Sequence, residues 1–455
     1  MTSFPACHDN RSNRLSPGVI FWFRNDLRLH DQVALAHAID IAHRLGGWLL
    51  PVYIHDNRLD AMTPWGFKRI GAKQTAWVRM ALDDLFNQLT RLGSTLIQVS
   101  GNSAHVLANL VHVLGGPLIV CEEIAAPEEQ DQVEEIRRNG VSVETVWQST
   151  LIAPESLPFK PEDLPDTFTK FRQLLEQYAV RATPPLEDVK VLPPLPGHSD
   201  LALCRGALHD LAASIDSNHP EIDPRSSFPW NQFRFHGGEK AALAHLDQYC
   251  GRGLPHSYKS TRNELIGIDY SSKWSPWLAT GALSARRAWA AIAKFEEMHG
   301  ANESTYWLFF ELLWRDHFRW LHLKYGKLLY AARGLKNISL PKHDHAAFKK
   351  WCDGETGNSF IDAGMNELAL TGYLSNRMRQ NVASFLIHDL RCDWRAGAAW
   401  FEANLIDYDV YSNQGNWLYL SGRGTDPRPT RRFNPQLQAK NYDPEGIYRK
   451  MWLET

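Results

Sequence analysis

The sequence predicts an α/β N-terminal domain with a doubly wound parallel five-stranded sheet, followed by an all-helical C-terminal domain. Three observations lead to this fold class. Five short β-rich runs alternate with helical patterns in residues 18–149. Residues 150–235 then form a connection rich in proline. From 236 to 455 the apolar residues recur at helical spacing.

The strand candidates of the first part are short apolar runs. They read GVIFWFR (18–24), WLLPVYIH (48–55), TLIQVSG (95–101), PLIVCEE (117–123) and VSVETVWQ (141–148). Nearly continuous apolar strands separated by helices indicate a parallel sheet covered on both faces, with ligands at the carboxyl ends of its strands. No GxGxxG follows the first strand, so a dinucleotide held in the Rossmann manner is not expected. Residues 1–17 are expected to form a disordered arm.

The connection and the helical part follow from proline content and from periodicity. RATPPLEDVKVLPPLPGHSD (181–200) holds five prolines in twenty residues, too many for a helix or a central strand. We therefore expect an extended connection over the surface. Beyond it, WSPWLATGALSARRAWAAIAKFEEM, STYWLFFELLWRDHFRWLHLKYG and SNRMRQNVASFLIHDL have helical spacing, and Ser284 and Ser375 are predicted N-caps.

Charge and tryptophan are unevenly distributed along the chain. Residues 250–455 hold 27 Lys+Arg against 21 Asp+Glu, a balance of +6, although the whole chain carries −2. Eleven of the 17 tryptophans lie in the same part. A basic, tryptophan-rich part favours an anionic and planar partner. A large helical core that uses tryptophan would give the same composition.

Other features of the sequence exclude classes of protein. No apolar run reaches the roughly 18 residues of a membrane-spanning helix. Six scattered cysteines without a CxxC pair favour a reducing compartment. The histidines of HDH at 343–345 are expected to be solvated, so no metal site is predicted. We expect a cytoplasmic monomer, or an organellar one if the N-terminal arm is a transit segment.

Two segments carry candidate binding residues. In DYSSKWSP (269–276), hydroxyls, a lysine and free N–H groups at a helix start would cradle a phosphate, and the alternative is an ordinary capping segment. In FELLWRDHFRW (310–320), Glu311, Trp314 and Arg315 share one helix face. These three would contact a planar ligand, or they would form a core tryptophan beside an internal ion pair.

Two later segments belong together for electrostatic reasons. SNRMR (375–379) places Arg379 at a helix start, where a buried arginine needs a carboxylate partner. LIDYDVYSNQGNWLY (405–419) mixes carboxylates, amides and an indole, and its Asp407 and Asp409 are near enough downstream to supply that partner.

With these segments in view, the chain resembles a known family. The blocks YKSTRNELIGIDYSSKWSPWLATGALS, FELLWRD, TGYLSNRMRQNVASF, LIDYDVYSNQGNWLY and GTDPR are similar to the photolyase/cryptochrome family. WFRNDLRLHD and LPDTFTKFR narrow the resemblance to its DASH-type cryptochromes. The resemblance covers the chain from about residue 18 to the end, and its long blocks in the family's order make it specific.

The resemblance implies an FAD held in a U shape inside the helical domain. Asp407 would orient Arg379, which offsets the charge of the reduced flavin, and Asn413 would meet flavin N5 without adding a charge. The implied cofactor-binding residues are Tyr258, Ser271, Ser272, Lys273, Trp274, Ser275, Glu311, Arg315, Asn376, Arg379, Asp407, Asp409 and Asn413.

The activity implied by the resemblance is blue-light-driven repair of cyclobutane pyrimidine dimers by electron transfer from excited, reduced FAD. Single-stranded or UV-damaged DNA is the expected partner, because a base leaves a single strand at lower cost; RNA is a further candidate. The alternatives are a blue-light receptor that signals without repair, and (6-4) repair, for which His256 is the nearby histidine. Implied catalytic residues are Glu311, Asn413, Trp417 and Trp394, and implied DNA contacts are Trp314, Tyr419 and Gln380.

This chain departs from what the resemblance implies for the tryptophan relay, and its antenna site rests on few residues. The family's electron relay falls on Trp417 and Trp394, but its distal tryptophan falls on Lys342; Trp320, Trp351 or a tyrosine would have to substitute. A 5,10-methenyltetrahydrofolate antenna between the domains would contact acidic residues after the fourth strand, here Glu123 and Glu128. Asn358, Asn366 and Arg423 also depart from the family's pattern, without a functional reason in the sequence.

Overall fold

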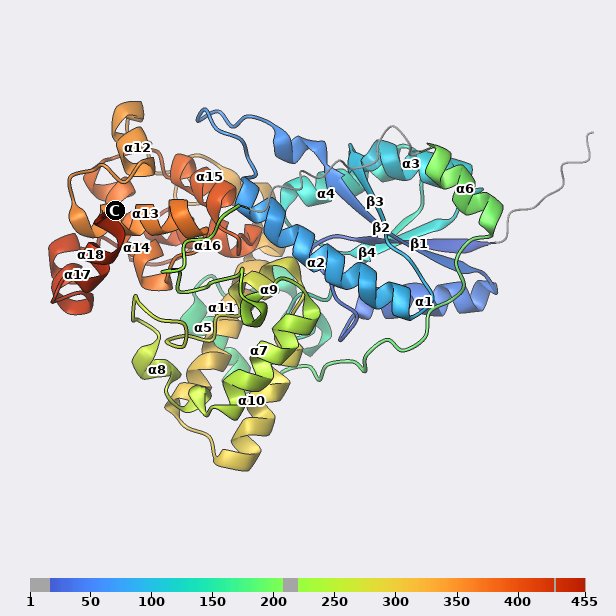
Figure 1. The fold of residues 1–455 in the computed structure, drawn as a ribbon, viewed down its shortest axis with the longest axis horizontal. Helices are drawn as coiled ribbons and strands as arrows, with labels where there is room; N and C mark the ends of the chain where they lie inside the picture. Colours follow the sequence, from blue (N-terminus) through green and yellow to red (C-terminus); the bar gives the residue numbers. More distant parts are fainter. Residues whose placement is uncertain (1–16, 208–219, 429–430, 455) are drawn as a thin grey trace, which may run out of the picture.

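A computed structural model describes residues 17–207, 220–428 and 431–454. Figure 1 shows a sheet with helices on both faces at one end of the molecule and a body of helices at the other. The predicted fold class is therefore confirmed. The predicted N-terminal arm lies almost wholly outside the described residues.

The sheet contains all five predicted strands. They are β1 (Gly18–Phe23), β2 (Trp48–Asp56), β3 (Ile97–Gly101), β4 (Leu118–Glu122) and β5 (Val143–Val146). All neighbours are parallel, in the order β3-β2-β1-β4-β5. The order reverses at β1, so a crevice is expected at the carboxyl ends of β1, β2 and β4.

Helices cover both faces of the sheet, as its continuous apolar strands require. One face packs on α1 (Val33–Leu45) and α2 (Ala72–Arg91). The other packs on α3 (Ser103–Val113), α4 (Pro127–Arg138) and α6 (His198–Ala207). Successive residues of β1 are buried on alternate faces, which explains why its sequence does not alternate between apolar and polar.

The connection is only partly extended. Residues 180–197 have neither helix nor strand, as the prolines predict. The same connection contains α6 and also α5 (Phe168–Gln177), which had not been anticipated. Helix α5 packs on α11 (Glu303–Tyr325) of the helical part through Phe168 and Phe171, so it belongs to that core.

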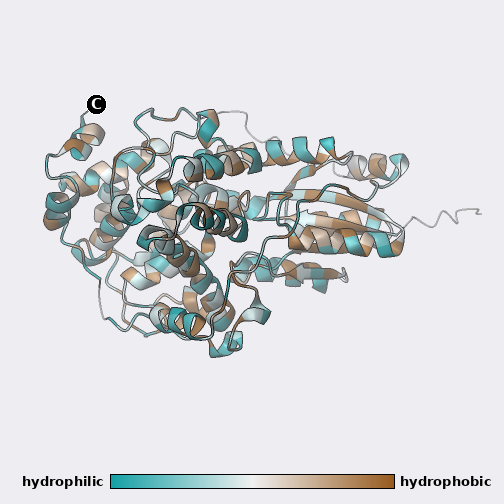
Figure 2. Ribbon diagram, turned by 90° about the horizontal axis from the view of Figure 1, so that it is seen from below, coloured by the Kyte–Doolittle hydropathy of each residue, from teal (hydrophilic) through white to brown (hydrophobic). Residues whose placement is uncertain are grey.

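The C-terminal part is helical, and hydrophilic and hydrophobic residues follow one another along its helices (Figure 2). Ser284 and Ser375 cap α10 and α14 as predicted. No helix among the described residues is long and apolar enough to cross a membrane. The helices are α7 (Glu239–Gly251), α8 (Tyr258–Thr261), α9 (Ser275–Thr280), α10 (Ala285–His299), α11 (Glu303–Tyr325), α12 (His345–Cys352), α13 (Ser359–Thr371), α14 (Asn376–Ser384), a π-helical turn (Phe385–Asp389), α15 (Trp394–Asn404), α16 (Val410–Leu420), α17 (Pro435–Tyr442) and α18 (Ile447–Leu453).

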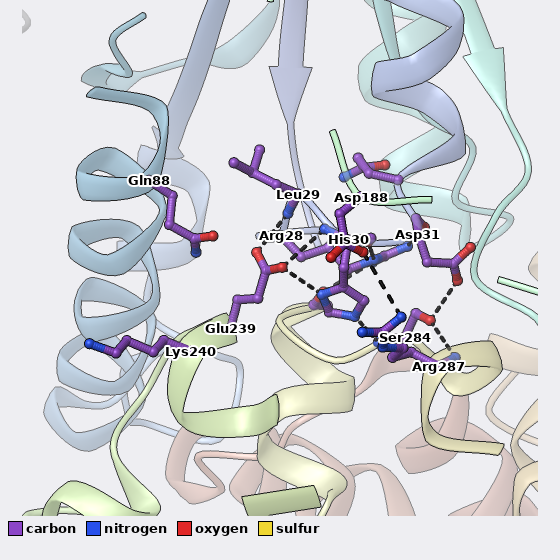
Figure 3. Close-up of polar contacts among 12 residues, drawn as sticks. Arg28, Leu29, His30, Asp31, Gln88, Asp188, Glu239, Lys240, Ser284 and Arg287 are labelled. Atoms are coloured by element: carbon purple, nitrogen blue, oxygen red, sulfur yellow. Dashed lines mark hydrogen bonds and ion pairs between the residues drawn. The ribbon is translucent and has the colours of Figure 1, made fainter. Parts of the chain in front are cut away.

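A buried polar cluster, formed by the loop after β1 with α7 and α10, joins the two parts (Figure 3). His30 Nδ1 lies 2.7 Å from Glu239 Oε1, and the same carboxylate accepts from the backbone N–H groups of Leu29 and His30. Asp31 accepts from Ser284 Oγ at 2.5 Å and from Arg286 Nε at 3.0 Å. Asp31 Oδ1 accepts from the backbone N–H of Leu186 at 2.9 Å, so each oxygen of the two buried carboxylates has a donor.

We predict that Glu239→Gln lowers the free energy of unfolding by about 3 kcal/mol, the scale expected when one partner leaves a buried ionic contact. Burial acts to raise the pKa of Glu239, but His30 and the backbone donors hold that pKa below its ordinary 4.5. The stabilisation is thus complete above pH 4.5 and is lost as pH falls through the lowered pKa.

Urea denaturation of both proteins from pH 7 to pH 3 measures this difference. The control is Glu297→Gln on the exposed side of α10, which should change stability by less than about 0.5 kcal/mol. A gap between wild type and Glu239→Gln that stays constant with pH would contradict the ionised role of Glu239.

Candidate functional site

The largest concentration of predicted site residues lies around one cavity of the helical part, which we call the central cavity. It has two adjoining lobes, with empty volumes of about 1110 and 1390 Å³ that include open solvent. Its walls come from the loop before α9 and from α8, α11, α14 and α16. Every predicted cofactor-binding residue lines at least one lobe.

One wall carries buried polar atoms without partners. Lys273 is 2% exposed, and its Nζ has no hydrogen bond although it lies 3.3 Å from the ring centroid of Tyr270. Burial lowers the pKa of Lys273 well below its ordinary value. Trp274 Nε1 is also unpartnered. Because buried polar atoms are nearly always hydrogen-bonded, this wall fits a polar, anionic ligand.

The backbone conformation at Lys273 is unusual. Lys273 has φ +59°, the left-handed region that side chains rarely occupy, just before α9 begins. Helix α9 is only six residues long, so the phosphate cradle predicted for this segment rests on the lysine and the neighbouring hydroxyls rather than on a helix dipole.

The central cavity also contains the expected arginine–carboxylate pair. Arg379 Nη2 lies 2.8 Å from Asp407 Oδ2, and its Nε donates to the carbonyl of Leu374. Asp407 is 5% exposed, and its Oδ1 has no partner. A fixed guanidinium beside an unpaired carboxylate oxygen fits a ring with both acceptor and donor groups at its edge.

Asp409 and Asn413 are already engaged by the protein. Asp409 caps α16 through the N–H of Ser412 and pairs with Arg319 Nη2 at 2.7 Å. Burial acts to raise the pKa of Asp409, but the charges of Arg319 and Arg315 bring it to about 2. Asn413, in the first turn of α16, donates its amide to the carbonyl of Ala398 at 3.1 Å, which fixes the orientation of the amide toward the cavity.

Glu311 has a different partner from the one considered in the sequence. It pairs with Arg262, which ends α8, while Arg315 donates to the carbonyls of Ser149 and Leu278. The suggested ion pair between Glu311 and Arg315 is therefore wrong. Burial raises the pKa of Glu311 above its ordinary value. The sequence signal for Arg262 was its position four residues after Tyr258, one helical turn away.

The predicted DNA contacts line one lobe of the central cavity. Trp314 and Tyr419 meet edge to face at 5.9 Å, and Phe168 of α5 stacks on Trp314 at 3.9 Å with an interplanar angle of 11°. One face of Trp314 is therefore covered by the protein. Gln380 lines both lobes and accepts from Arg377 at 3.1 Å.

Aromatic rings lead away from the central cavity. Trp417 is 1% exposed and meets Phe401 at 5.2 Å, and Phe401 stacks on Trp351 at 6.3 Å. Trp394 donates to the carbonyl of Ala332 and lies one turn before Gly397, where an added Cβ would meet the Trp417 ring. Trp320 instead stacks on Trp147.

The predicted antenna residues lie near a second cavity, between the sheet and the helical part. That cavity has an empty volume of about 2340 Å³, including open solvent, and its lining includes Tyr53, His55 and Tyr408. Glu128 lines an adjoining hollow and pairs with Arg69 at 2.5 Å. Glu123 lines neither space. Burial raises the pKa of the preceding Glu122 to about 8.

The remaining sequence departures have structural explanations. Asn358 caps α13, Asn366 donates to the carbonyl of Trp452, and Arg423 donates to the carbonyl of Ser339 at 2.7 Å. His256 contacts the carbonyl of Gly300 and lines neither lobe of the central cavity. Among the described residues, no group of three potential metal ligands occurs, the HDH segment at 343–345 included.

Comparison with known proteins places these features in a family. Residues 19–190 match the family described as DNA photolyase, and residues 307–455 match the FAD binding domain of DNA photolyase. The chain is 42% identical to a Cryptochrome DASH of Xenopus laevis, covering 96% of this chain and 82% of the relative. It is 40% identical to Cryptochrome DASH of Synechocystis sp., and the match covers 96% of this chain and 87% of the relative.

Solved structures agree with this relationship. A cryptochrome of Synechocystis sp. superposes with a TM-score of 0.88 at 40% identity, over 96% of this chain and 88% of the other. A bacterial class III photolyase from Agrobacterium tumefaciens gives a TM-score of 0.74 at 28% identity, over 98% and 88%.

We predict that Lys273→Met lowers the flavin content of the purified protein severalfold, because an unpartnered ammonium would be lost from the cavity wall. The flavin-free protein should become no less stable, since replacing a buried charge by an apolar side chain is often neutral or stabilising. Absorbance ratios of flavin to protein and thermal denaturation measure the two effects. The control is Lys259→Met, which removes an exposed cation paired with Glu303. Equal flavin content in both variants would contradict the role of Lys273.

Proposed function

This chain belongs to the DASH-type cryptochromes of the photolyase/cryptochrome family, and from that premise we propose that it binds FAD in the central cavity and repairs cyclobutane pyrimidine dimers in single-stranded DNA under blue light. The observation that carries the proposal is the set of buried, unpartnered polar atoms on the cavity walls: Lys273 Nζ, Trp274 Nε1 and Asp407 Oδ1.

These atoms match the chemistry of a flavin dinucleotide. Lys273 would hold the diphosphate, and the pair of Arg379 and Asp407 would hold the polar edge of the ring system, with the guanidinium offsetting negative charge. Asn413 would present its oriented amide to the ring without adding charge. When bound and reduced, the flavin supplies a light-driven electron; the chain supplies position, charge and exclusion of water.

The lobe of the central cavity that Trp314 and Tyr419 line suits a flipped-out lesion. Trp314 and Tyr419 offer aromatic surface, worth about 1–3 kcal/mol for each stacked base. Glu311 lines the same lobe, and its carboxylate can accept a hydrogen bond from a pyrimidine N–H. Arg262 keeps Glu311 in place. Extrusion from a single strand costs less than from a duplex, which supports the strand preference.

Ring contacts support Trp351 as the substitute for the missing distal tryptophan. Trp351 is connected to Trp417 through Phe401, and it stacks on Phe348 at 6.0 Å on its other side. Phe348 in turn lies 6.5 Å from Trp65, which is half-buried. Trp320 is connected to Trp147 instead. We therefore assign the electron supply to Trp417, Trp394 and Trp351.

The cavity between the sheet and the helical part is the proposed place of an antenna. It lies at the carboxyl ends of β1 and β2, where open α/β sheets bind ligands, and Tyr53 and Tyr408 offer aromatic surface. A folate is the proposed chromophore. An archaeal photolyase of Sulfolobus tokodaii, 26% identical, is described with two FAD molecules and a novel light-harvesting cofactor.

The subcellular location and the oligomeric state stay predictions. Relatives from Arabidopsis thaliana and Oryza sativa are named chloroplastic/mitochondrial, which supports the organellar alternative to a cytoplasmic monomer. The separate domain boundaries at 149 and 235 are likewise proposed.

The proposed repair is tested with purified, reduced protein and dimer-containing oligo(dT). Under blue light, the thymine absorbance should recover faster for the single strand than for the same strand annealed to its complement. A dark sample is the control. No recovery in either form would overturn repair, and a light-dependent change in partner binding would then favour the photoreceptor alternative.

We predict that Trp351→Phe slows photoreduction of the flavin severalfold without changing repair by protein that has been reduced chemically. Trp320→Phe removes an equally buried tryptophan outside the ring path and is the matched control. Flavin absorbance under illumination with an external thiol measures the first effect, and dimer repair the second. Equal photoreduction in the two variants would remove Trp351 from the electron supply.

A further inference from the structure

A third cavity lies beside the central cavity, and we call it the side pocket. It is formed by the first turn of α5, by one face of α11, by α16 and by the loop 424–428, and its empty volume is about 900 Å³ including open solvent. Trp314, Phe318 and Tyr419 line both the side pocket and the central cavity. The aromatic rings of these three residues thus form a wall that the two spaces share.

The side pocket contains a buried polar atom that no protein group satisfies. His317 is 1% exposed, and its Nε2 donates to the carbonyl of Pro165 at 3.1 Å. The ring is neutral, because burial lowers its pKa to about 4. Nδ1 therefore carries a lone pair, and it has no partner. A neutral acceptor among aromatic rings is suited to a nucleobase N–H.

The mouth of the side pocket is suited to an anion. Thr167, the N-cap of α5, makes no capping hydrogen bond with its side chain, so N–H groups of the first turn stay available. Arg428 is exposed, and its guanidinium forms no ion pair with any residue that the structure describes. Arg431 differs, because Asp426 binds it at 2.6 Å while it covers the Tyr419 ring.

The segment LPDTF (164–168) is held against α11, and its Thr167 and Phe168 line this pocket. Pro165 accepts from His317, Asp166 accepts from Lys324 Nζ at 2.7 Å, and Phe168 stacks on Trp314. Three residues of α11 thus hold one short segment of the connection. The start of α5 and Arg428 both line the pocket.

We propose that the side pocket binds the nucleotide next to the dimer in the same DNA strand, with its base N–H on His317 Nδ1 and its phosphate between Arg428 and the start of α5. The proposal rests on the proposed function, because the dimer in the central cavity brings the strand past the shared wall of Trp314 and Tyr419. Continuity of the two spaces favours a nucleotide of the strand over a free one.

Dark binding of the purified holoprotein tests the proposal. The three probes are fluorescent oligo(dT) strands with one dimer: the first is otherwise intact, the second has an abasic residue directly 5′ of the dimer, and the third has it directly 3′. We expect wild type to lose affinity about tenfold for one of the two abasic probes, the scale of one stacked base, and to bind the other normally. Equal affinity for all three probes would overturn the proposal.

Two variants on one loop assign the phosphate contact. Arg428→Ala should weaken binding and reduce the salt dependence of log Kd by about 0.7, the contribution of one phosphate contact on a single strand. Arg432→Ala removes a neighbouring exposed cation that pairs with Asp389 outside the pocket, and it should leave both quantities unchanged. Identical behaviour of the two variants would contradict the assignment.

His317→Leu tests the base contact. It should bind the intact and the abasic probes with equal affinity; retained discrimination would overturn the role of Nδ1. If this variant fails to fold, the proposal is tested by the comparison of Arg428→Ala with Arg432→Ala. Saturable binding of thymidine 5′-monophosphate, together with indifference to the flanking residue, would assign the pocket to a free nucleotide and overturn the proposal.

The proposed function and this inference fail in distinguishable ways. A wild type without any preference for dimer-containing strands would overturn both. A clear preference for the dimer that ignores the flanking residues would overturn this inference alone.

Discussion

The buried polar cluster formed by the loop after β1 with α7 and α10 is the constraint on which the arrangement of the two parts depends. Glu239 and Asp31 are buried carboxylates, and each accepts hydrogen bonds from the other part of the chain; Asp31 accepts a further one from the backbone N–H of Leu186. Gly281 shows how close the contact is, because a Cβ there would come within 2.0 Å of the carbonyl of Asn25. A carboxylate left without these donors would be costly, so the contact has one geometry.

This geometry reaches the central cavity through α9. Leu27 donates its N–H to the carbonyl of Thr280, the last residue of α9, and Arg28 donates to the carbonyl of Gly281. Lys273 and Trp274 come directly before that helix. The loop after the first strand therefore positions a cavity wall more than 240 residues away in the sequence.

The central cavity contains polar groups that have protein partners and polar groups that have none. Asp409 and Glu311 are bound by Arg319 and Arg262, so their orientation is fixed before any ligand arrives. Lys273 and one oxygen of Asp407 lack partners, so their stabilisation has to come from a ligand. Preorganised groups around a few unsatisfied ones favour tight and oriented binding of a polar cofactor.

The sequence by itself determined the five strands, the helical character of the C-terminal part, the caps at Ser284 and Ser375, and the need of Arg379 for a carboxylate partner from the segment that holds Asp407 and Asp409. Periodicity, capping chemistry and the charge of a buried arginine are local properties that the order of residues encodes directly. Tertiary structure decided that Arg262 pairs with Glu311, that Phe168 covers Trp314 and that Phe401 connects Trp417 to Trp351. Most of these partners lie far apart in the sequence, and packing of helices, which no local pattern encodes, brings them together.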